Sequence, residues 1–140
     1  MSSQEEQINK LKKLHGEVFA PMVQQLGIEP IEITSKGARF EIPAVDYIMR
    51  TGDIVCGQAV ASIADTVGVM TLFAHNEEMR IMTTVDMTTH FMRPLAKGML
   101  EAEAVILSNG RRMATVRIEV KQKDSEKTAG TTTCAYVYVS

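Results

Sequence analysis

The chain has few of the residue types from which metal centres and disulfide frameworks are built. Its 140 residues include two cysteines and three histidines. Cys56 and Cys134 have neither a CxxC spacing nor the spacing of metal ligands. His15, His75 and His90 are too scattered along the chain to suggest a metal cluster. We therefore expect no metal site, and a cytoplasmic protein whose cysteines are reduced.

The sequence also lacks an excess of charge of one sign and an unbroken apolar run. A formal net charge of -2 gives no general field to attract nucleic acid or an anionic membrane. The first residues, MSSQEEQINKLKK, contain no apolar segment of the kind that a secretory signal needs. Polar side chains interrupt the longest apolar stretch, residues 54–74, and Asp65 alone would cost roughly 2.5 to 3.5 kcal/mol at a membrane centre. We expect neither a nucleic-acid partner nor a membrane partner.

Three common motifs are absent from the sequence. There is no GxSxG nucleophile elbow, no GxxxxGK[ST] phosphate loop and no GxGxxG dinucleotide fingerprint. Any catalytic chemistry must therefore come from another arrangement of side chains.

The spacing of apolar residues predicts the elements of the first half of the chain. Residues 1–26 place apolar side chains three and four apart, which predicts an amphipathic helical segment that Pro21 splits in two. Residues 28–35 and 37–44 alternate, which predicts a hairpin. Residues 54–75 show no alternation and contain no proline, so we expect one long helix, apolar on nearly all sides and therefore buried.

Alternation returns in the second half of the chain. We expect strands over residues 80–92, 98–107, 112–123 and 128–139, with a hairpin turn at Ser108-Asn109-Gly110. In the first of these runs, a continuous alternation sets Thr84 and Asp86 on one face and Val85 and Met87 on the other. The economical architecture for this order is one antiparallel sheet wrapped around a central helix. We predict an α+β fold and a single domain over residues 1–140.

A polar stripe runs along the predicted central helix. Gln58, Ser62 and Asp65 stand at i, i+4 and i+7, so they share one face. A buried carboxylate costs several kcal/mol unless it is satisfied, and desolvated acids concentrate at functional sites. A purely structural acid, bonded to neighbouring groups, is the alternative. At the helix start, around Gly57, unpaired N–H groups and the positive end of the helix dipole could stabilise an oxyanion.

The helix sequence GQAVASIAD and the strand sequence TTVDMTTHFMRP resemble the PaaI-type acyl-CoA thioesterases, which have the hotdog fold. The resemblance covers roughly residues 20–139. The family commonly carries HGG, then an acid on the central helix, then a strand of the form [ST]VD[ML] with an aromatic residue and [RS]P further on. Asp65 matches the acid, and residues 84–87 match the strand. The sequence departs from the family in having Cys56-Gly57-Gln58 in place of HGG, and Arg50 where many members have asparagine.

The resemblance implies hydrolysis of an acyl-CoA thioester without a metal or an organic cofactor. It implies Asp65 as general base or nucleophile, the Gly57 N–H as oxyanion donor, and Thr84 as the residue that orients the water or the carboxylate. The candidate substrate-binding residues, including cations for the CoA phosphates, are Arg50, Cys56, Gln58, Arg93, Arg111 and Arg112.

Two other functions are compatible with the same fold. One is a regulatory or acyl-CoA binding domain that does not cleave the thioester, although such a binder would have no use for a carboxylate facing an anionic ligand. The other, a hydratase or dehydratase, is weaker because no histidine is paired with an acid on the helix.

The distance along the helix predicts an oligomer. Asp65 lies eight residues after Gly57, which separates the two backbones by roughly 12 Å at about 1.5 Å per residue. One carbonyl cannot contact both groups on the same helix. We therefore expect a homo-oligomer, a dimer or a dimer of dimers, in which antiparallel central helices bring Arg50 and Gly57 of one chain beside Asp65 and Thr84 of another.

Overall fold

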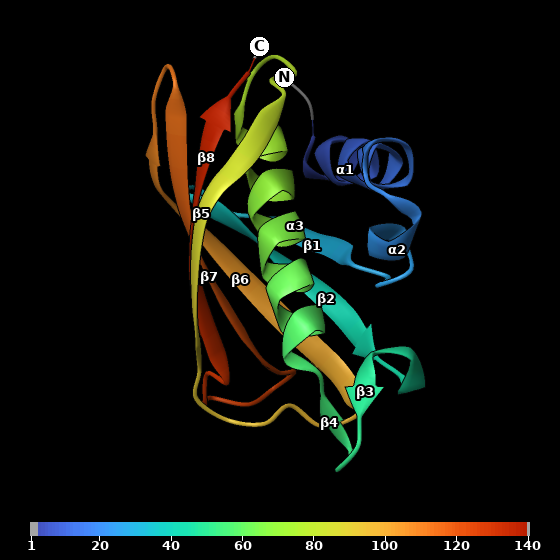
Figure 1. Cartoon of the computed structure of the whole chain (residues 1–140). Coiled ribbons are helices and arrows are strands. Elements are labelled where there is room, and N and C mark those ends of the chain that lie inside the picture. Colours follow the sequence, from blue (N-terminus) through green and yellow to red (C-terminus); the bar gives the residue numbers. More distant parts are fainter. Residues whose placement is uncertain (1–2, 140) are drawn as a thin grey trace.

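The protein is an antiparallel sheet that wraps around one long helix (Figure 1). The computed structural model describes residues 3–139, so residues 1, 2 and 140 of the predicted domain lie outside the described residues. The helices are α1 (Gln4–Val18), α2 (Pro21–Gln24), the short 3-10 helix η1 (Asp46–Ile48) and α3 (Gly57–His75). The strands are β1 (Glu29–Ile33), β2 (Gly37–Ala44), β3 (Met49–Arg50), β4 (Ile54–Val55), β5 (Met82–Phe91), β6 (Gly98–Asn109), β7 (Met113–Gln122) and β8 (Gly130–Tyr138).

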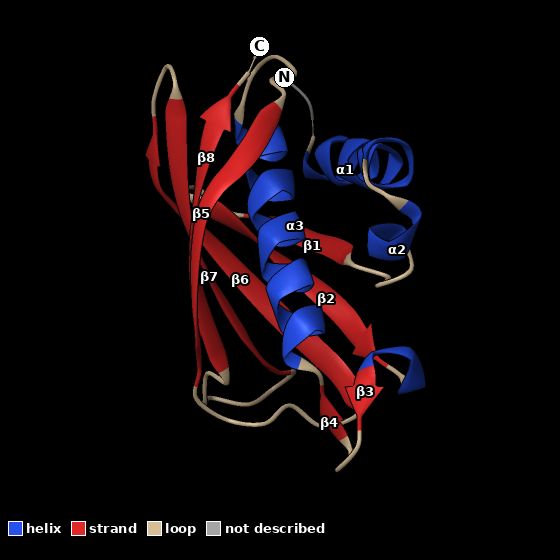
Figure 2. Cartoon of the chain, viewed as in Figure 1, coloured by secondary structure: helices blue, strands red, loops and turns tan. Residues whose placement is uncertain are grey.

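Six strands form the main sheet in the order β1-β2-β6-β7-β8-β5, and each neighbouring pair is antiparallel (Figure 2). The two predicted hairpins, β1-β2 and β6-β7, are both present. The strand pairs and the long helix confirm the predicted α+β architecture. β1 and β5 are the two edge strands of this sheet. Within the described residues, no further strand pairs with the outer edge of either one.

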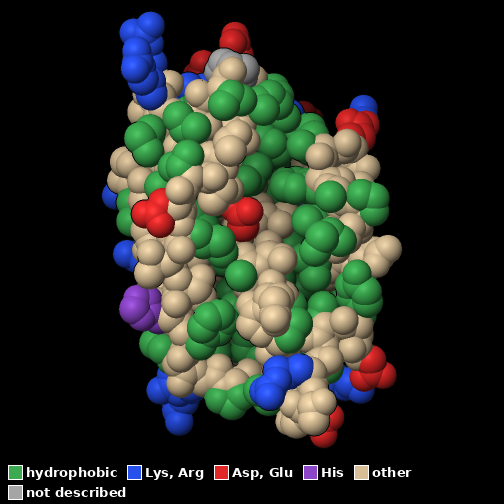
Figure 3. Space-filling model, in the orientation of Figure 1, with side chains coloured by type: hydrophobic (Ala, Val, Ile, Leu, Met, Phe, Trp, Pro, Cys, Tyr) green, Lys and Arg blue, Asp and Glu red, His purple; other side chains and the backbone are tan. Residues whose placement is uncertain are grey.

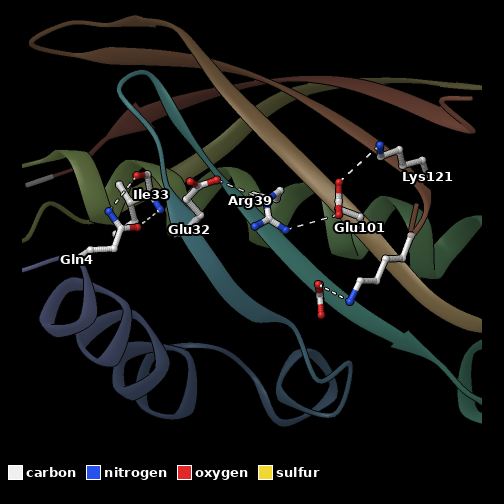
Figure 4. A network of polar contacts seen from close by, with 8 residues as sticks. Gln4, Glu32, Ile33, Arg39, Glu101 and Lys121 are labelled. Atoms are coloured by element: carbon white, nitrogen blue, oxygen red, sulfur yellow. Dashed lines mark hydrogen bonds and ion pairs between the residues drawn. The ribbon is translucent and has the colours of Figure 1, made fainter. Parts of the chain in front are cut away.

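Two helices form the N-terminal segment, as predicted. The Ser3 hydroxyl accepts a hydrogen bond from the Glu6 N–H at the start of α1, and α2 begins at Pro21. Proline is tolerated at the first position of a helix but not inside one, which explains the break. Gln4 exchanges two hydrogen bonds with the backbone of Ile33, of 2.5 and 3.2 Å, and so attaches α1 to the edge strand β1 (Figure 4).

The long helix α3 supplies the centre of the core. It begins at Gly57, three residues later than predicted, because residues 54–55 pair with residues 49–50 as the short ladder β3-β4. Its side chains Ile63, Val67 and Met70 are fully buried in the same cluster as residues of the sheet. By length and composition α3 could cross a membrane, but most of it is buried inside the protein. It is therefore a core helix.

The edge strand β5 departs from the predicted alternation. Thr84 pairs with Tyr136, but Asp86 pairs with the next residue of β8, so Val85 is the extra residue of a β-bulge. Beyond the bulge the two faces are exchanged: Met87 is part-buried against the core, whereas Asp86 is exposed. The prediction that Thr84 and Asp86 share a face is wrong. Side chains alternate between the two faces of a strand, so one inserted residue moves every later side chain to the opposite face.

The outer face of the sheet carries charged side chains in ion pairs (Figure 4). Arg39 contacts Glu32 at 3.5 Å and Glu101 at 3.6 Å, and Lys121 also contacts Glu101 at 3.6 Å. Surface pairs of this kind each contribute about 0 to 1 kcal/mol. The apolar core between the sheet and α3 therefore dominates the stability of the fold.

Substituting Gly37 by alanine should destabilise the protein strongly. A Cβ at Gly37 would lie 1.7 Å from the backbone oxygen of Ala104 on β6, and a clash with backbone cannot be relieved by rotating a side chain. We expect Gly37→Ala to lower the free energy of unfolding by about 1 to 3 kcal/mol or more, measured by urea denaturation. Gly16→Ala is the control, since a Cβ there meets nothing within 4 Å, and it should be neutral or slightly stabilising. Equal stability of the two variants would contradict the close β2-β6 packing.

Candidate active site

Asp65 lies on the uncovered side of α3. The predicted polar stripe is present there: Gln58 is exposed, and Ser62 and Asp65 are half-buried. The Ser62 hydroxyl is used within the helix, where it donates to the Gln58 carbonyl at 2.9 Å. Asp65 is half-buried within one chain, and none of the described helices or strands lies over this side of α3 (Figure 1). Many apolar side chains surround the exposed polar groups on this face of the molecule (Figure 3).

Thr84 fixes the orientation of the Asp65 carboxylate. Its hydroxyl oxygen Oγ1 donates to Asp65 Oδ1 at 2.7 Å, which joins the edge strand β5 to α3. No donor from residues 3–139 bonds the second carboxylate oxygen, Oδ2. The carboxylate is therefore held by one oxygen and open to water or a ligand through the other.

Tyr136 is a neighbour of Asp65 that the sequence analysis did not identify. Its hydroxyl donates to the main-chain carbonyl of Asp65 at 3.1 Å, and its side chain is fully buried. Burial raises the pKa of Tyr136, so the hydroxyl stays protonated and acts as a donor at neutral pH. The one sequence signal was Gly68, since glycine inside a helix costs about 1 kcal/mol relative to alanine. A Cβ at Gly68 would lie 2.0 Å from the Tyr136 hydroxyl.

The start of α3 presents unpaired backbone donors. Cys56 is the N-cap residue, but its side chain makes no capping hydrogen bond. The N–H groups of Ala59 and Val60 both donate to the Cys56 carbonyl. The N–H groups of Gly57 and Gln58 have no acceptor within the described part of the chain. Two free donors at the positive end of a helix dipole form a place where negative charge is stabilised.

A pocket of about 510 Å³ opens beside these donors. Gly57, Val60, Phe91 and Leu95 belong to its mainly apolar lining. The Phe91 ring lies 3.5 Å from the position that a Cβ on Gly57 would occupy, so the ring and the helix start are in close contact. The volume lies within the range of pockets that bind small molecules. Residues 129–130, which also line the pocket, carried no motif by which the sequence could have identified them.

Four of the predicted substrate-binding residues lie at or beside this pocket. Arg50 and Arg93 line it, and Arg93 Nη1 donates to the Thr128 carbonyl at 2.7 Å. Cys56 and Gln58 flank Gly57 at the helix start but are not part of the lining. The two arginines place positive charge at a pocket that is otherwise apolar.

Two other predicted residues lie apart from the pocket. Arg111 and Arg112 belong to the turn between β6 and β7, at the end of the sheet where α3 finishes (Figure 1). The pocket lies at the other end, because β8 runs from the pocket residue Gly130 to Tyr138, whose N–H donates to the Arg112 carbonyl. Within one chain, these two arginines and the pocket cannot contact the same small ligand.

The chemically useful groups therefore fall into two half-sites on one helix. The first, the carboxylate half-site, is Asp65 with Thr84; the second, the donor half-site, is the Gly57 N–H with its pocket, whose lining includes neither Asp65 nor Thr84. A carboxylate can activate water or attack a carbonyl, and backbone donors can stabilise the resulting oxyanion. The two half-sites lie roughly 12 Å apart along α3, so within one chain they cannot act on the same carbonyl group.

Other reactive groups contribute less. Burial raises the pKa of the Cys134 thiol, which makes this cysteine a poor nucleophile at neutral pH. The described residues contain no group of three or more histidine, cysteine or acidic side chains arranged to hold a metal ion. The carboxylate and the helix start are thus the groups best placed for chemistry.

Known proteins share this sequence pattern and fold. The family model of the Thioesterase superfamily matches residues 52–129, which include α3 with Gly57 and Asp65, and Thr84 of β5. "Putative esterase Ta0293" of Thermoplasma acidophilum is 22% identical over 116 residues, which are 83% of this chain and 87% of that protein.

Two solved structures have a closely similar backbone. Thioesterase HI1161 from Haemophilus influenzae has a TM-score of 0.81 and 19% identity, over 92% of this chain and 90% of that one. The E. coli PaaI protein from the phenylacetic acid degradation operon has a TM-score of 0.82 and 18% identity, over 99% and 97%. The family match and the shared architecture together show that this chain belongs to the thioesterase superfamily and has the PaaI-type hotdog fold.

Proposed function

We propose that the protein hydrolyses an acyl-CoA thioester to a free acid and CoA. The observation that carries this proposal is the pair of half-sites: a carboxylate held by one oxygen, and unpaired helix N–H groups beside an apolar pocket. Thioester hydrolysis needs both an activated oxygen nucleophile and a donor for the oxyanion. Membership of the thioesterase superfamily supports the reaction class. A cytoplasmic location stays a prediction.

Asp65 carries the central chemical role in this proposal. As a general base it takes a proton from water, the water oxygen attacks the thioester carbonyl, and the C–S bond breaks as the thiolate of CoA leaves and is protonated. As a nucleophile it forms a mixed anhydride with the acyl group, releasing the CoA thiolate, and water then hydrolyses the anhydride. In both cases Thr84 holds Oδ1, so that the free oxygen Oδ2 is the reacting atom.

The two half-sites act together only if they come from two chains. A two-fold dimer with antiparallel α3 helices would place Gly57 of one chain beside Asp65 of the other, forming two equivalent sites. The edge strand β5 supports this arrangement, because a long unpaired edge is a template for pairing with another chain. Val85, Phe91 and Met92 are each at least half exposed along this edge, which also favours a covered interface.

The arginines supply the charge that the phosphates of CoA require. Arg50 and Arg93 line the pocket, which leads to the proposed oxyanion position. In an antiparallel dimer the partner's β6-β7 turn, with Arg111 and Arg112, approaches the pocket end of the first chain, so these residues remain candidates in the assembled protein. Cys56 and Gln58 shape the helix start around the Gly57 donor.

Asp65→Asn should abolish turnover while leaving the fold intact. The amide has nearly the same shape but can neither accept a proton usefully nor attack a carbonyl, so we expect kcat to fall by about a hundredfold or more. Thiol release from a panel of acyl-CoA thioesters measures this, and circular dichroism checks the fold. If Asp65→Asn hydrolyses the best substrate within a few-fold of wild type, Asp65 is neither the catalytic base nor the nucleophile. A protein that binds acyl-CoA tightly but cleaves none of the panel would instead be the binding domain.

Gly57→Pro should remove the oxyanion donor without unfolding the helix. Cys56 has φ -68° and ψ 148°, the conformation that a residue before proline prefers, and Gly57 is the first residue of α3. Loss of one such donor typically lowers kcat by about a hundred- to a thousandfold. Gly57→Ala is the matched control, since it keeps the N–H and its Cβ makes only ordinary contacts with Phe91. An active Gly57→Pro enzyme would refute the donor role.

Mixing the two inactive variants should restore activity. In a heterodimer of Asp65→Asn and Gly57→Pro chains, one site inherits both defects and the other inherits none. Co-refolding equal amounts should therefore recover about a quarter of wild-type activity. Native mass spectrometry confirms that subunits have exchanged. Mixed dimers without recovered activity would show that each site is built from one chain.

A further inference from the structure

Asp65 receives hydrogen bonds from two residues that are paired on neighbouring strands of the sheet. Thr84 of β5 and Tyr136 of β8 are directly paired, and opposed residues of antiparallel strands project to the same face. Thr84 donates to the carboxylate at 2.7 Å, and Tyr136 donates to the main-chain carbonyl of the same residue at 3.1 Å. The sheet thus contacts both the side chain and the backbone of Asp65 through one cross-strand pair.

The Tyr136 contact depends on the absence of a side chain at Gly68. Gly68 lies three residues after Asp65, on the same face of the helix. A Cβ there would lie 2.0 Å from the Tyr136 hydroxyl and 3.0 Å from the ring carbon Cζ. The Asp65 carbonyl also accepts the regular helix bond from residue 69, so the tyrosine bond is not needed to satisfy a buried acceptor. The hydrogen bond from Tyr136 instead fixes the position of α3 along β8.

The bulge at Val85 completes the arrangement on the other strand. It follows Thr84 directly, so Thr84 turns inward to Asp65 while Asp86 is exposed. With regular alternation, Asp86 would share the face of Thr84 and bring a second negative charge toward Asp65. Bulges beside functional sites commonly reorient one side chain in this way.

We propose that Tyr136 is a positioning residue of the active site, and that its hydroxyl, seated against Gly68, holds Asp65 at the position where Thr84 orients the carboxylate. This inference rests on the proposed function, because it assumes that Asp65 acts in catalysis. Tyr136 is buried beneath the helix and does not line the pocket, so it acts through Asp65 and not on the substrate.

Tyr136→Phe tests the role of the hydroxyl alone. A small displacement of a reacting group is costly, so we expect kcat to fall by about tenfold or more, with KM for the best acyl-CoA thioester changed by less than about twofold. The melting temperature should change little. Tyr138→Phe is the matched control: it removes another β8 hydroxyl, which donates to Asn109 Oδ1 at 2.6 Å and accepts from Asn76, away from Asp65. This control should keep the wild-type kcat.

Gly68→Ala separates positioning from stability. Alone, it should lower both the melting temperature and kcat, because the new methyl group collides with the Tyr136 hydroxyl. In the Tyr136→Phe background the hydroxyl is absent, and a shift of the ring by a few tenths of an ångström accommodates the methyl group. The double variant should therefore recover the melting temperature of Tyr136→Phe but keep its low kcat. A purely structural role predicts that kcat recovers with stability.

The outcomes distinguish this inference from the proposed function. Wild-type kcat in Tyr136→Phe, together with an inactive Asp65→Asn enzyme, would overturn the positioning role and leave the proposed function intact. An active Asp65→Asn enzyme would overturn the proposed function itself. A kcat that follows the melting temperature through all three variants would also overturn the positioning role.

Discussion

The hydrogen bond between Thr84 and Asp65 joins the edge of the sheet to the central helix, and the geometry of the site depends on it. For Thr84 to reach the helix, β5 must extend along α3, and its alternation must place the hydroxyl inward at that point. The bulge at Val85 follows immediately and turns the next acid outward. The strand thus serves both as a wall of the core and as the support of a carboxylate whose second oxygen stays open.

The geometry of a single helix explains why the proposed site would be divided between two chains. Unpaired N–H donors exist only in the first turn of a helix, and the first turn of α3 contains Gly57. Asp65 lies more than two turns further on, where Thr84 and Tyr136 can hold it but where backbone donors are already used. A second chain in the opposite direction would bring a first turn to this carboxylate. The exposed apolar residues on β5 are consistent with such an interface.

Much of the fold could be predicted from the sequence, because its signals are local. Pro21 marks the helix break, the alternation over residues 28–44 marks the first hairpin, and the turn signal at Asn109-Gly110 marks the second. The spacing of the polar residues also correctly placed Gln58 and Asp65 on one side of α3, where Gln58 is exposed and Asp65 is half-buried. The bulge at Val85 was missed, because a threonine-rich strand shows no break in its pattern where a residue is inserted. The contact of Tyr136 with Asp65 was missed because it joins residues 71 positions apart.

The most direct test of the shared site is a crystal structure with a non-hydrolysable acyl-CoA analogue, in which a methylene group replaces the thioester sulfur and leaves a ketone. We expect the ketone oxygen to lie about 3 Å from the Gly57 N–H of one chain. The carboxylate of Asp65 from the other chain should lie within reach of the ketone carbon, directly or through one water. A ketone bound by Gly57 with no Asp65 nearby, or contacted by both residues of a single chain, would contradict the shared site.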